Sequence, residues 1–446
     1  CNGLLYAPPH NCACYPEAKL FGMNALAPAA ASRETPKEVS DEGRLERGPA
    51  YEDIADAAPG DTEWPTYRHD AARSGYLQQD VPATLKSAWK TDFDSKLSSV
   101  VVAYDKLFVA EVDRHTVHAL NASTGEKVWS YTAGGRVDSP PTIHKGRAIF
   151  GAADGWMYCL RASDGALAWR FRAAPRDERL MAFEQLESVW PVHGSVLVEN
   201  DVIYFIAGRS NFLDSGMRFF RVHAETGRKI SEGLMDDRDP HTGEDLQNHI
   251  KVLQMPVALP DILSSDSVYV YLRSQQIDME GNRLEIAPHS GDFAGQASVQ
   301  RGPTQHLFAP MGFLDDTWFH RSYWVYGRSF AGGHGGYYQA GKYTPSGRLL
   351  VFDDDNVYGY GRKPEYLKWT TTIEHQLFAS GKEPPPQARS EADEKLAGKK
   401  NAPQASTMIR YGRPSGLNPT GKALTVEAWI QADRPEGVVV AHGGPA

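Results

Sequence analysis

The sequence is poor in cysteine, in long apolar runs and in excess positive charge. Four cysteines in 446 residues are too few for a disulfide scaffold. No run approaches the roughly 20 apolar residues that a helix needs to cross a bilayer, so no transmembrane segment is expected. Asp and Glu outnumber Lys and Arg by 56 to 47, and the net charge of −9 argues against a nucleic-acid partner, because phosphate binding needs concentrated basic side chains.

The cysteine positions leave several interpretations open. Cys1 stands in place of Met, which indicates a fragment boundary, with a lipid-modified mature lipoprotein as the alternative. Cys12 and Cys14 would point to opposite faces of an extended strand, so one of them pairs elsewhere or neither has a role. A metal site and a redox site are the alternatives for this pair. Cys159 falls in an apolar run and is predicted to be a buried small side chain.

Helical periodicity is also missing, and a longer repeat takes its place. Trp89, Trp129 and Trp169 follow one another at intervals of 40 residues. The last two each close a phrase made of a polar turn, a Gly and the Trp, and two short apolar runs precede each turn. Four short strands in about 40 residues are typical of a propeller blade, whereas helical repeats would show a period of 3.6 residues.

Further copies are degenerate. Residues 202–208 and 219–230 keep the hairpin and the Thr-Gly turn, but Ser231 stands where Trp is expected. Residues 3–9 and 20–28 are predicted to form the same hairpin with an insertion at its tip. The later blades are predicted around residues 267–272, 348–353 and 357–360.

The phrase from Ala119 to Trp129, with Asn121 and Thr124-Gly125 inside it, resembles the tryptophan-docking repeat of pyrroloquinoline-quinone (PQQ) type β-propellers. Residues 64–75 also look like the segment that often opens such propellers. The resemblance covers about residues 63–370 and is strongest between 85 and 231. It implies an all-β ring of four-stranded antiparallel blades, seven or eight in the intact protein, in which each Trp stacks on the turn of the next copy. The residues it implies for this docking are Trp89, Gly125, Trp129, Gly165, Trp169 and Gly227.

The chain divides by composition and motif. We expect a partial blade over residues 1–28, a loop or insertion over 29–62, propeller blades over 63–378 and a polar, Pro-rich linker over 379–405. Residues 406–446, which include a Thr-x-Glu-x-Trp strand ending at Trp429, resemble the opening of a laminin-G or concanavalin-like sandwich. About 40 residues are too few for such a two-sheet domain, so the chain is expected to be cut at both ends.

The resemblance alone does not settle whether a cofactor is bound. The family includes quinoprotein alcohol dehydrogenases, which hold PQQ over a Trp and bind calcium, and an outer-membrane assembly lipoprotein that binds no quinone. This sequence has no adjacent Cys pair and no Cys-x-x-Cys-His haem motif. No PQQ ligand can be carried over residue by residue, so PQQ and calcium belong only to the dehydrogenase alternative.

One departure from the repeat is a candidate binding site. Residues 181–195 lengthen the interval between Trp169 and Ser231 to 62 residues. Long loops of propellers gather at one rim of the central channel, so polar groups of this segment are expected to line a shared cavity there. The alternative is that the segment simply packs at the inner strand of a blade. The candidate ligand-binding residues are Gln185, Glu187, Trp190 and His193.

A second departure, residues 313–328, collects acids, a His, two Arg residues and several aromatic rings. Such groups suit sugar binding, and in β-elimination on a uronic acid Arg would neutralise the carboxylate while His or Tyr takes the C5 proton. An ordinary half-buried strand after an Asp-Asp turn is the alternative. The candidates are Asp315, Asp316, His320, Arg321 and Tyr323 for catalysis, and Trp324 and Arg328 for ligand binding.

Two further segments favour structural roles. Asp353–Asn356 offers oxygen ligands suited to calcium, but a hairpin tip needs the same polar residues. Gly332–Gly336 contains no lysine, so it is predicted to be a flexible loop rather than a phosphate-binding loop. No metal site is assigned.

The sequence therefore predicts an exported PQQ-like β-propeller that acts as a binding or scaffold module, with carbohydrate as the expected ligand. Its location outside the cytoplasm rests on the resemblance. The alternatives are a quinoprotein dehydrogenase, a propeller-type polysaccharide lyase or hydrolase, and a protein scaffold like the outer-membrane assembly lipoprotein. The expected partners are a polysaccharide or cell-surface glycan, or another protein.

Overall fold

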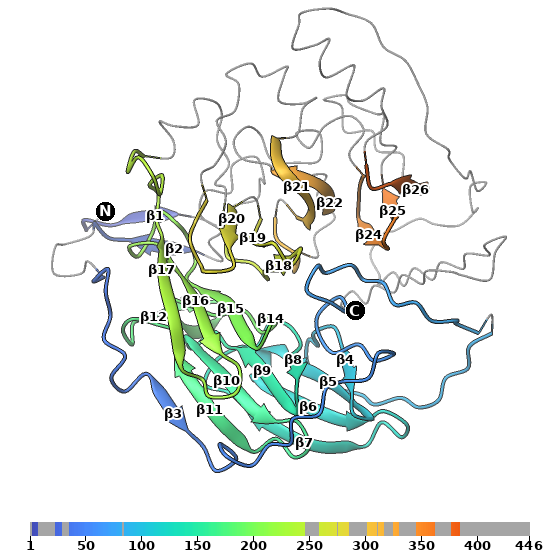
Figure 1. Cartoon of the computed structure of the whole chain (residues 1–446). Helices are drawn as coiled ribbons and strands as arrows, with labels where there is room; N and C mark the ends of the chain where they lie inside the picture. The colour runs from blue at the N-terminus through green and yellow to red at the C-terminus, as the bar shows by residue number, and fades with distance from the viewer. Residues whose placement is uncertain are drawn as a thin grey trace, which may run out of the picture.

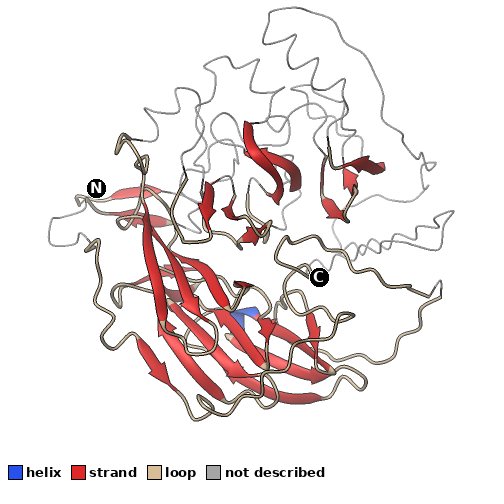
Figure 2. Cartoon of the chain, in the orientation of Figure 1, coloured by secondary structure: helices blue, strands red, loops and turns tan. Residues whose placement is uncertain are grey.

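The computed structural model describes residues 2–7, 23–28, 35–82, 84–245, 258–273, 275–284, 301–309, 311–315, 324–329, 345–361 and 376–383. Strands dominate these residues, and a single 3-10 turn, η2 (Val112–Arg114), is drawn as helix in Figure 2. Within this part of the chain, no helix has the length and apolar character needed to cross a membrane. The all-β class expected from the sequence is confirmed for these residues.

The strands are short and follow one another along the chain. Their bounds are β1 (Leu5–Ala7), β2 (Asn24–Leu26), β3 (Leu45–Arg47), β4 (Val101–Ala103), β5 (Lys106–Glu111), β6 (Thr116–Asn121), β7 (Lys127–Thr132), β8 (Thr142–His144), β9 (Arg147–Gly151), β10 (Trp156–Arg161), β11 (Leu167–Arg172), β12 (Arg179–Ala182), β13 (Gln185–Ser188), β14 (Leu197–Glu199), β15 (Val202–Ala207), β16 (Met217–His223), β17 (Lys229–Met235), β18 (Ser264–Ser265), β19 (Tyr269–Leu272), β20 (Gln275–Asp278), β21 (Arg301–Phe308), β22 (Trp324–Ser329), β23 (Ser346–Gly347), β24 (Leu349–Phe352), β25 (Asn356–Gly361) and β26 (Gln376–Gly381).

The predicted four-strand repeat is present as antiparallel sheets. Strands β4–β7, β8–β11 and β14–β17 each form a meander in chain order, and three-stranded sheets follow as β18–β20, β21–β23 and β24–β26. The sheets are arranged along an arc (Figure 1), with hydrophobic cores between neighbours. One such core joins Trp169 and Phe171 of β11 to Phe205 and Phe220 of the next sheet. The short apolar runs of the sequence are thus inner faces of packed sheets.

Tryptophan docking fastens the first junctions. A Cβ atom added to Gly165 would lie 2.7 Å from the Trp129 ring, and one added to Gly227 would lie 2.6 Å from the Trp169 ring. Trp129 Nε1 donates to the Ala162 carbonyl at 3.0 Å. Only glycine fits beneath each ring, because a Cβ atom there would clash with it, and the positive φ of the turn also favours glycine. Trp89 and Gly125 make the same contact on β4–β7.

The junction after β17 uses a different side chain. Ser231 stands at the Trp position and pairs across the sheet with Arg221 of β16. Arg221 Nη1 donates to the Glu280 carbonyl at 2.6 Å, and a Cβ atom on Gly281 would lie 2.9 Å from Arg221 Cδ. Arg221 thus occupies the place of the missing indole and bonds the carbonyl beside the next turn glycine.

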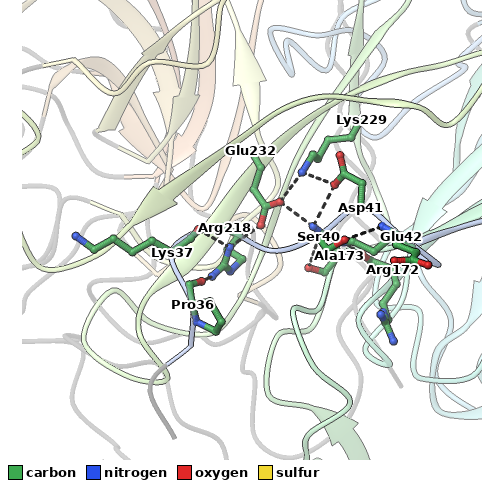
Figure 3. A network of polar contacts seen from close by, with 11 residues as sticks. Pro36, Lys37, Ser40, Asp41, Glu42, Arg172, Ala173, Arg218, Lys229 and Glu232 are labelled. Carbon is green, nitrogen blue, oxygen red and sulfur yellow. Dashed lines mark hydrogen bonds and ion pairs between the residues drawn. The ribbon is translucent and has the colours of Figure 1, made fainter. Parts of the chain in front are cut away.

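Residues 35–57 lie against the outer edge of two sheets. Within the stretch 29–62, predicted as a loop or insertion, β3 adds a fifth strand to β11. Arg44 is fully buried, donates to the Arg172 and Ala173 carbonyls, and pairs with Glu232 at 2.7 Å. Figure 3 shows Glu232 between Arg218 and Lys229, its two other cationic partners. A segment without apolar periodicity is ordered here by edge pairing and buried charge, which composition alone does not reveal.

Residues 64–75, the segment that resembles a propeller opening, bond to the first strands of five of the larger sheets, or to residues just before them, and to the β21–β22 connection. Trp64 exchanges two backbone hydrogen bonds with Val102 of β4, and the Pro65 carbonyl accepts from Ile143 of β8. The fully buried Arg73 donates to the carbonyls of Val196, before β14, and Leu263, before β18. The remaining contacts are Ala71 with Ser265 of β18, Ser74 with Phe352 of β24, and Tyr67 with Phe313 in the β21–β22 connection.

Other predicted hairpins are present as well. β1 pairs with β2, as expected from residues 3–9 and 20–28. β24 and β25 pair around the Asp353–Asn356 tip, where Asp353 Oδ1 accepts from the amides of Asp355 and Asn356. Asp353–Asn356 therefore forms the hairpin tip that was the alternative to a calcium site. Cys159 is fully buried in β10, as predicted.

Candidate functional site at one rim of the sheets

The candidate site lies on the connections that precede the innermost strands. The β7–β8 connection supplies Arg136 and Asp138, the β11–β14 connection supplies the β12–β13 hairpin and His193, and the β5–β6 turn supplies His115. In an antiparallel meander these connections all lie at the same end of the sheets. Side chains separated by up to about 80 residues in sequence therefore meet at one rim, and we call this group the rim cluster.

An aspartate–histidine pair forms one side of the rim cluster. Asp138 Oδ2 lies 2.6 Å from His193 Nδ1, and Asp138 Oδ1 accepts from the Gly194 amide at 2.9 Å. Burial alone would raise the pKa of Asp138, but the imidazole, Arg136 and the Gly194 amide hold it well below its usual value. The carboxylate is therefore ionised near neutral pH and fixes the orientation of the ring.

A buried ion pair forms the other side. Arg136 Nε donates to Glu187 Oε1 at 2.7 Å, and both side chains are almost fully buried. Burial raises the pKa of Glu187, while Arg136 opposes that shift. The Phe183 ring covers the same guanidinium, with Arg136 Cζ 3.8 Å from the ring centroid. Arg136 thus contacts the hairpin twice, at Glu187 near its base and at Phe183 in its turn.

The hairpin itself has a rigid turn and an apolar exposed face. Phe183 and Glu184 both have positive φ, as a two-residue hairpin turn of the primed type requires, although neither is glycine. Met181 and Leu186 are direct cross-strand partners and are 61 % and 54 % exposed. Gln185 is tied back to His115 and to the Asp113 carbonyl. The sheet rim therefore presents a hairpin on which Met181 and Leu186 form an exposed apolar pair, beside the partly exposed Phe183.

The polar side chains of the rim cluster are largely engaged with protein partners. His193 is oriented as a general base would be, but Arg136, Glu187 and Gln185 are engaged with one another and with the backbone. Among the described residues, no three His, Cys, Asp or Glu side chains are placed to share a metal ion. We derive no step through PQQ or calcium.

The rim candidates of the sequence analysis separate into two groups. Gln185, Glu187 and His193 meet in the rim cluster. Trp190 is 1 % exposed and packs in the hydrophobic core with Phe171 and Phe205, so its ring does not line the rim. The alternative of inner-strand packing therefore describes Trp190, whereas Glu187 and His193 lie in the rim cluster.

The candidates in 313–328 are described only in part. Trp324 contacts Phe313 edge-on at 6.2 Å, and Arg68 covers the Trp324 ring at 4.1 Å. The Asp315 amide bonds the Gly312 carbonyl in a turn. Arg328 belongs to β22, but its side chain lies outside the described part. Outside the described residues altogether lie Asp316, His320, Arg321 and Tyr323, the 332–336 loop, Cys12, Cys14 and residues 406–446.

The sequence analysis did not find Arg136, Asp138 and His115. A signal was available in the repeat, since Asp138 and His193 each stand four positions before the first residue of an innermost strand, Thr142 or Leu197. Aligning the repeats on their first strands rather than on the Trp would have paired these two residues. His115 carries no such signal, because it reaches the hairpin only through the fold.

Comparison with known proteins finds a family whose model matches the region of the Trp repeat. The model of a family described as outer membrane protein assembly factor BamB matches residues 78–186. Those residues carry PQQ-type β-propeller repeats. The BamB protein of Yersinia pestis is 28% identical over 110 residues, which is 22% of this chain and 28% of the relative.

Two solved propellers are also similar to this one. Quinohemoprotein alcohol dehydrogenase from Comamonas testosteroni is 16% identical, with 67% of this chain and 57% of that chain covered and a TM-score of 0.44. BamB from Moraxella catarrhalis is 15% identical, with 61% and 72% covered and a TM-score of 0.35.

Proposed function

We propose that this chain is an extracytoplasmic PQQ-type β-propeller that acts as a protein-binding scaffold, and that its partner docks on the β12–β13 hairpin. The observation that carries the proposal is the exposed Met181–Leu186 pair on a hairpin that Arg136, Glu187, Gln185 and His115 hold in place. Exposed apolar side chains on a preorganised element lose little conformational entropy on binding, which favours a protein interface. The similarity of residues 78–186 to an assembly factor is consistent with a protein partner and a location outside the cytoplasm.

Affinity capture with surface variants tests the proposal. The tagged chain and its Met181→Ser/Leu186→Ser variant are compared for the proteins they retain from an envelope extract of the source cells. We expect a partner that the wild type retains and the variant loses at least tenfold. The matched control is Val128→Ser/Val268→Ser, which changes two exposed apolar residues on other surfaces and should retain the partner. Equal retention by the hairpin variant would contradict the proposal.

The carbohydrate-directed function expected from the sequence has less support. The described aromatic rings of 313–328 pack inward: Phe313 and Tyr326 are buried, and Arg68 covers Trp324. A sugar-binding platform needs an open ring face. Binding of a polysaccharide on a glycan array, unaffected by the hairpin variant, would support this function instead.

The enzyme alternatives stay predictions with separate tests. A quinoprotein dehydrogenase would reduce a dye with alcohols or aldoses after addition of PQQ and calcium, and a lyase or hydrolase would release unsaturated uronates or reducing ends. The domain division also stays a prediction, including the blade over 1–28, the linker over 379–405, the laminin-G-like segment over 406–446 and a ring of seven or eight blades.

A further inference from the structure

A serine, a histidine and a glutamate form a hydrogen-bonded chain on the β4–β7 sheet, outside the rim cluster. Ser130 of β7 and His118 of β6 are direct cross-strand partners, and Ser130 Oγ lies 2.8 Å from His118 Nδ1. The other ring nitrogen, Nε2, lies 3.1 Å from Glu111 Oε2 at the end of β5. An imidazole between a hydroxyl and a carboxylate is the arrangement that activates a serine nucleophile, which is recognised by geometry rather than by sequence position.

The carboxylate at one end of the chain is held through both of its oxygens. Glu111 Oε1 accepts from Ser95 Oγ at 3.0 Å and lies 3.1 Å from Arg114 Nε, while Oε2 faces the imidazole. Burial alone would raise the pKa of Glu111, but His118, Ser95 and Arg114 hold it below its ordinary value. Because an ionised carboxylate only accepts hydrogen bonds, the ring nitrogen that faces it, His118 Nε2, carries the proton.

The imidazole is neutral near neutral pH. His118 is almost fully buried, and burial lowers its pKa although the bond to Glu111 opposes that shift. With the proton on Nε2, the lone pair of His118 Nδ1 is directed at Ser130 and accepts the hydrogen of its hydroxyl. A neutral, oriented imidazole with its free nitrogen on a hydroxyl is placed to act as a general base.

The serine is the accessible end of the chain. Ser130 is exposed on an edge strand of its sheet, whereas His118 is 3 % exposed. The register of β6 and β7 shifts at this point, so that Lys127 pairs with Leu120. His118 and Leu120 lie two residues apart and therefore share a face of the sheet. Their cross-strand partners, Ser130 and Lys127, lie on the same face.

Three side chains beside the serine suit an ester with an apolar acyl group. The rings of Phe93 and His118 have their centroids 5.1 Å apart, and Lys127 Nζ lies 5.5 Å from the Phe93 centroid. Val128, which is 47 % exposed, stands two positions before Ser130 on the same strand. The apolar side chains offer contact to an acyl group, and the ammonium group can stabilise the negative charge that develops on a carbonyl oxygen under attack.

We propose that Ser130 is a nucleophile and that the chain hydrolyses esters of small apolar acids, with His118 as the base and Glu111 as the residue that positions it. Ser130 Oγ forms a bond to the carbonyl carbon while its proton passes to His118 Nδ1. The bond from that carbon to the ester oxygen then breaks, and the alcohol leaves with this proton. Water attacks the acyl group next, gives its proton to the same nitrogen, and the acid leaves as the serine hydroxyl is restored.

This site shares no residue with the β12–β13 hairpin, so either proposal can fail without the other. Labelling with an alkyl fluorophosphonate, which loses fluoride as it bonds to an activated serine oxygen, tests the nucleophile. We expect peptide mapping by mass spectrometry to find the adduct on Ser130 of the folded full chain, and to find none after unfolding in urea. Ser123→Ala, at an exposed serine of the β6–β7 turn, should label like the wild type. No adduct on Ser130 of the folded chain, or an equal adduct on the unfolded chain, would overturn the proposal.

Hydrolysis of p-nitrophenyl acetate tests the roles of the three residues. Ser130→Ala, at an exposed position, should keep the melting temperature of the wild type and lose about a hundredfold or more of the hydrolysis rate. Glu111→Gln should lower kcat and leave KM unchanged, because Glu111 acts through the imidazole and does not contact the ester. If Ser130→Ala hydrolyses the ester at the rate of the wild type and of Ser123→Ala, the serine is not a nucleophile and the proposal is wrong.

Discussion

Two kinds of junction fasten the sheets of this propeller. Between β8–β11 and β14–β17, the fully buried Trp169 rests on Gly227 and donates to the Glu225 carbonyl at 3.1 Å. At the next junction the half-buried Arg221 makes the analogous bond beside Gly281. The indole brings a large buried apolar surface, whereas the guanidinium brings a charge-assisted hydrogen bond and little burial. Both junctions therefore have a glycine in the turn, whereas the side chain that packs on it is Trp in one and Arg in the other.

The largest effect is expected for removal of the buried indole. Trp169→Ala should lower the free energy of unfolding by about 3–5 kcal/mol, because a large core cavity is left between two sheets. Urea denaturation measures this loss. Trp89→Ala, at a more exposed copy of the same contact, should cost clearly less. If Trp89→Ala and Trp169→Ala lower the free energy of unfolding equally, the contact of the ring with the turn glycine, and not the burial of the ring, determines the stability of a junction.

The glycine under the ring is the next test. Gly165→Ala places a Cβ atom 2.7 Å from Trp129 at φ +76°, whereas Gly243→Ala meets nothing within 4 Å at φ +71°. We expect about 2–3 kcal/mol of destabilisation at Gly165 and about 1 kcal/mol at Gly243, since only the first adds a clash to the backbone strain. Thermal unfolding of the two variants isolates the contribution of the docked ring.

A smaller effect is expected at the arginine junction. Arg221→Ala removes one charge-assisted hydrogen bond from a half-buried site, which should cost about 1 kcal/mol. Arg228→Ala on the exposed turn nearby should be neutral in the same denaturation experiment. Ser231→Trp added to Arg221→Ala should recover the loss if the two side chains truly serve the same position. Further destabilisation by that Trp would contradict the equivalence.

The effect that depends on pH concerns the charges beside the Trp169 junction. Burial would raise the pKa of Glu232, but Arg44, Arg218 and Lys229 lower it below its ordinary value. A carboxyl with a lowered pKa in the folded state stabilises the fold above its unfolded pKa, and this stabilisation is lost as the pH falls through the lowered value. The melting temperature of Glu232→Gln should therefore approach that of the wild type as the pH falls from 7 toward 3. A constant difference would show that Glu232 is not ionised in the folded chain.

The sequence was most informative where the repeat is regular. The phrases that end at Trp129 and Trp169 predicted the strands, and the family resemblance implied the docking contacts that these residues make. The segment 64–75 was noticed only as a resemblance, because its hydrogen bonds go to five separate sheets and one connection and leave no periodic pattern. β3 was missed for a related reason: its order comes from the β11 edge and from Arg44, not from local propensity.

At the rim, the long departure after Trp169 drew attention to Glu187 and His193, which both lie in the rim cluster. Their partners could not be predicted from that segment, since Arg136 and Asp138 belong to the preceding connection and meet the hairpin only in the folded chain. Trp190 shows the opposite case, in which an aromatic residue beside polar ones belongs to the core.

Photo-crosslinking tests the central claim, that a protein partner docks on the β12–β13 hairpin, most directly. A photoreactive residue is placed at Met181 in one variant and at the similarly exposed Val268 in another, and both are irradiated with the envelope extract. The account predicts a discrete protein adduct from position 181 that is absent from position 268. Adducts at both positions alike, or at neither in a folded chain, would contradict it.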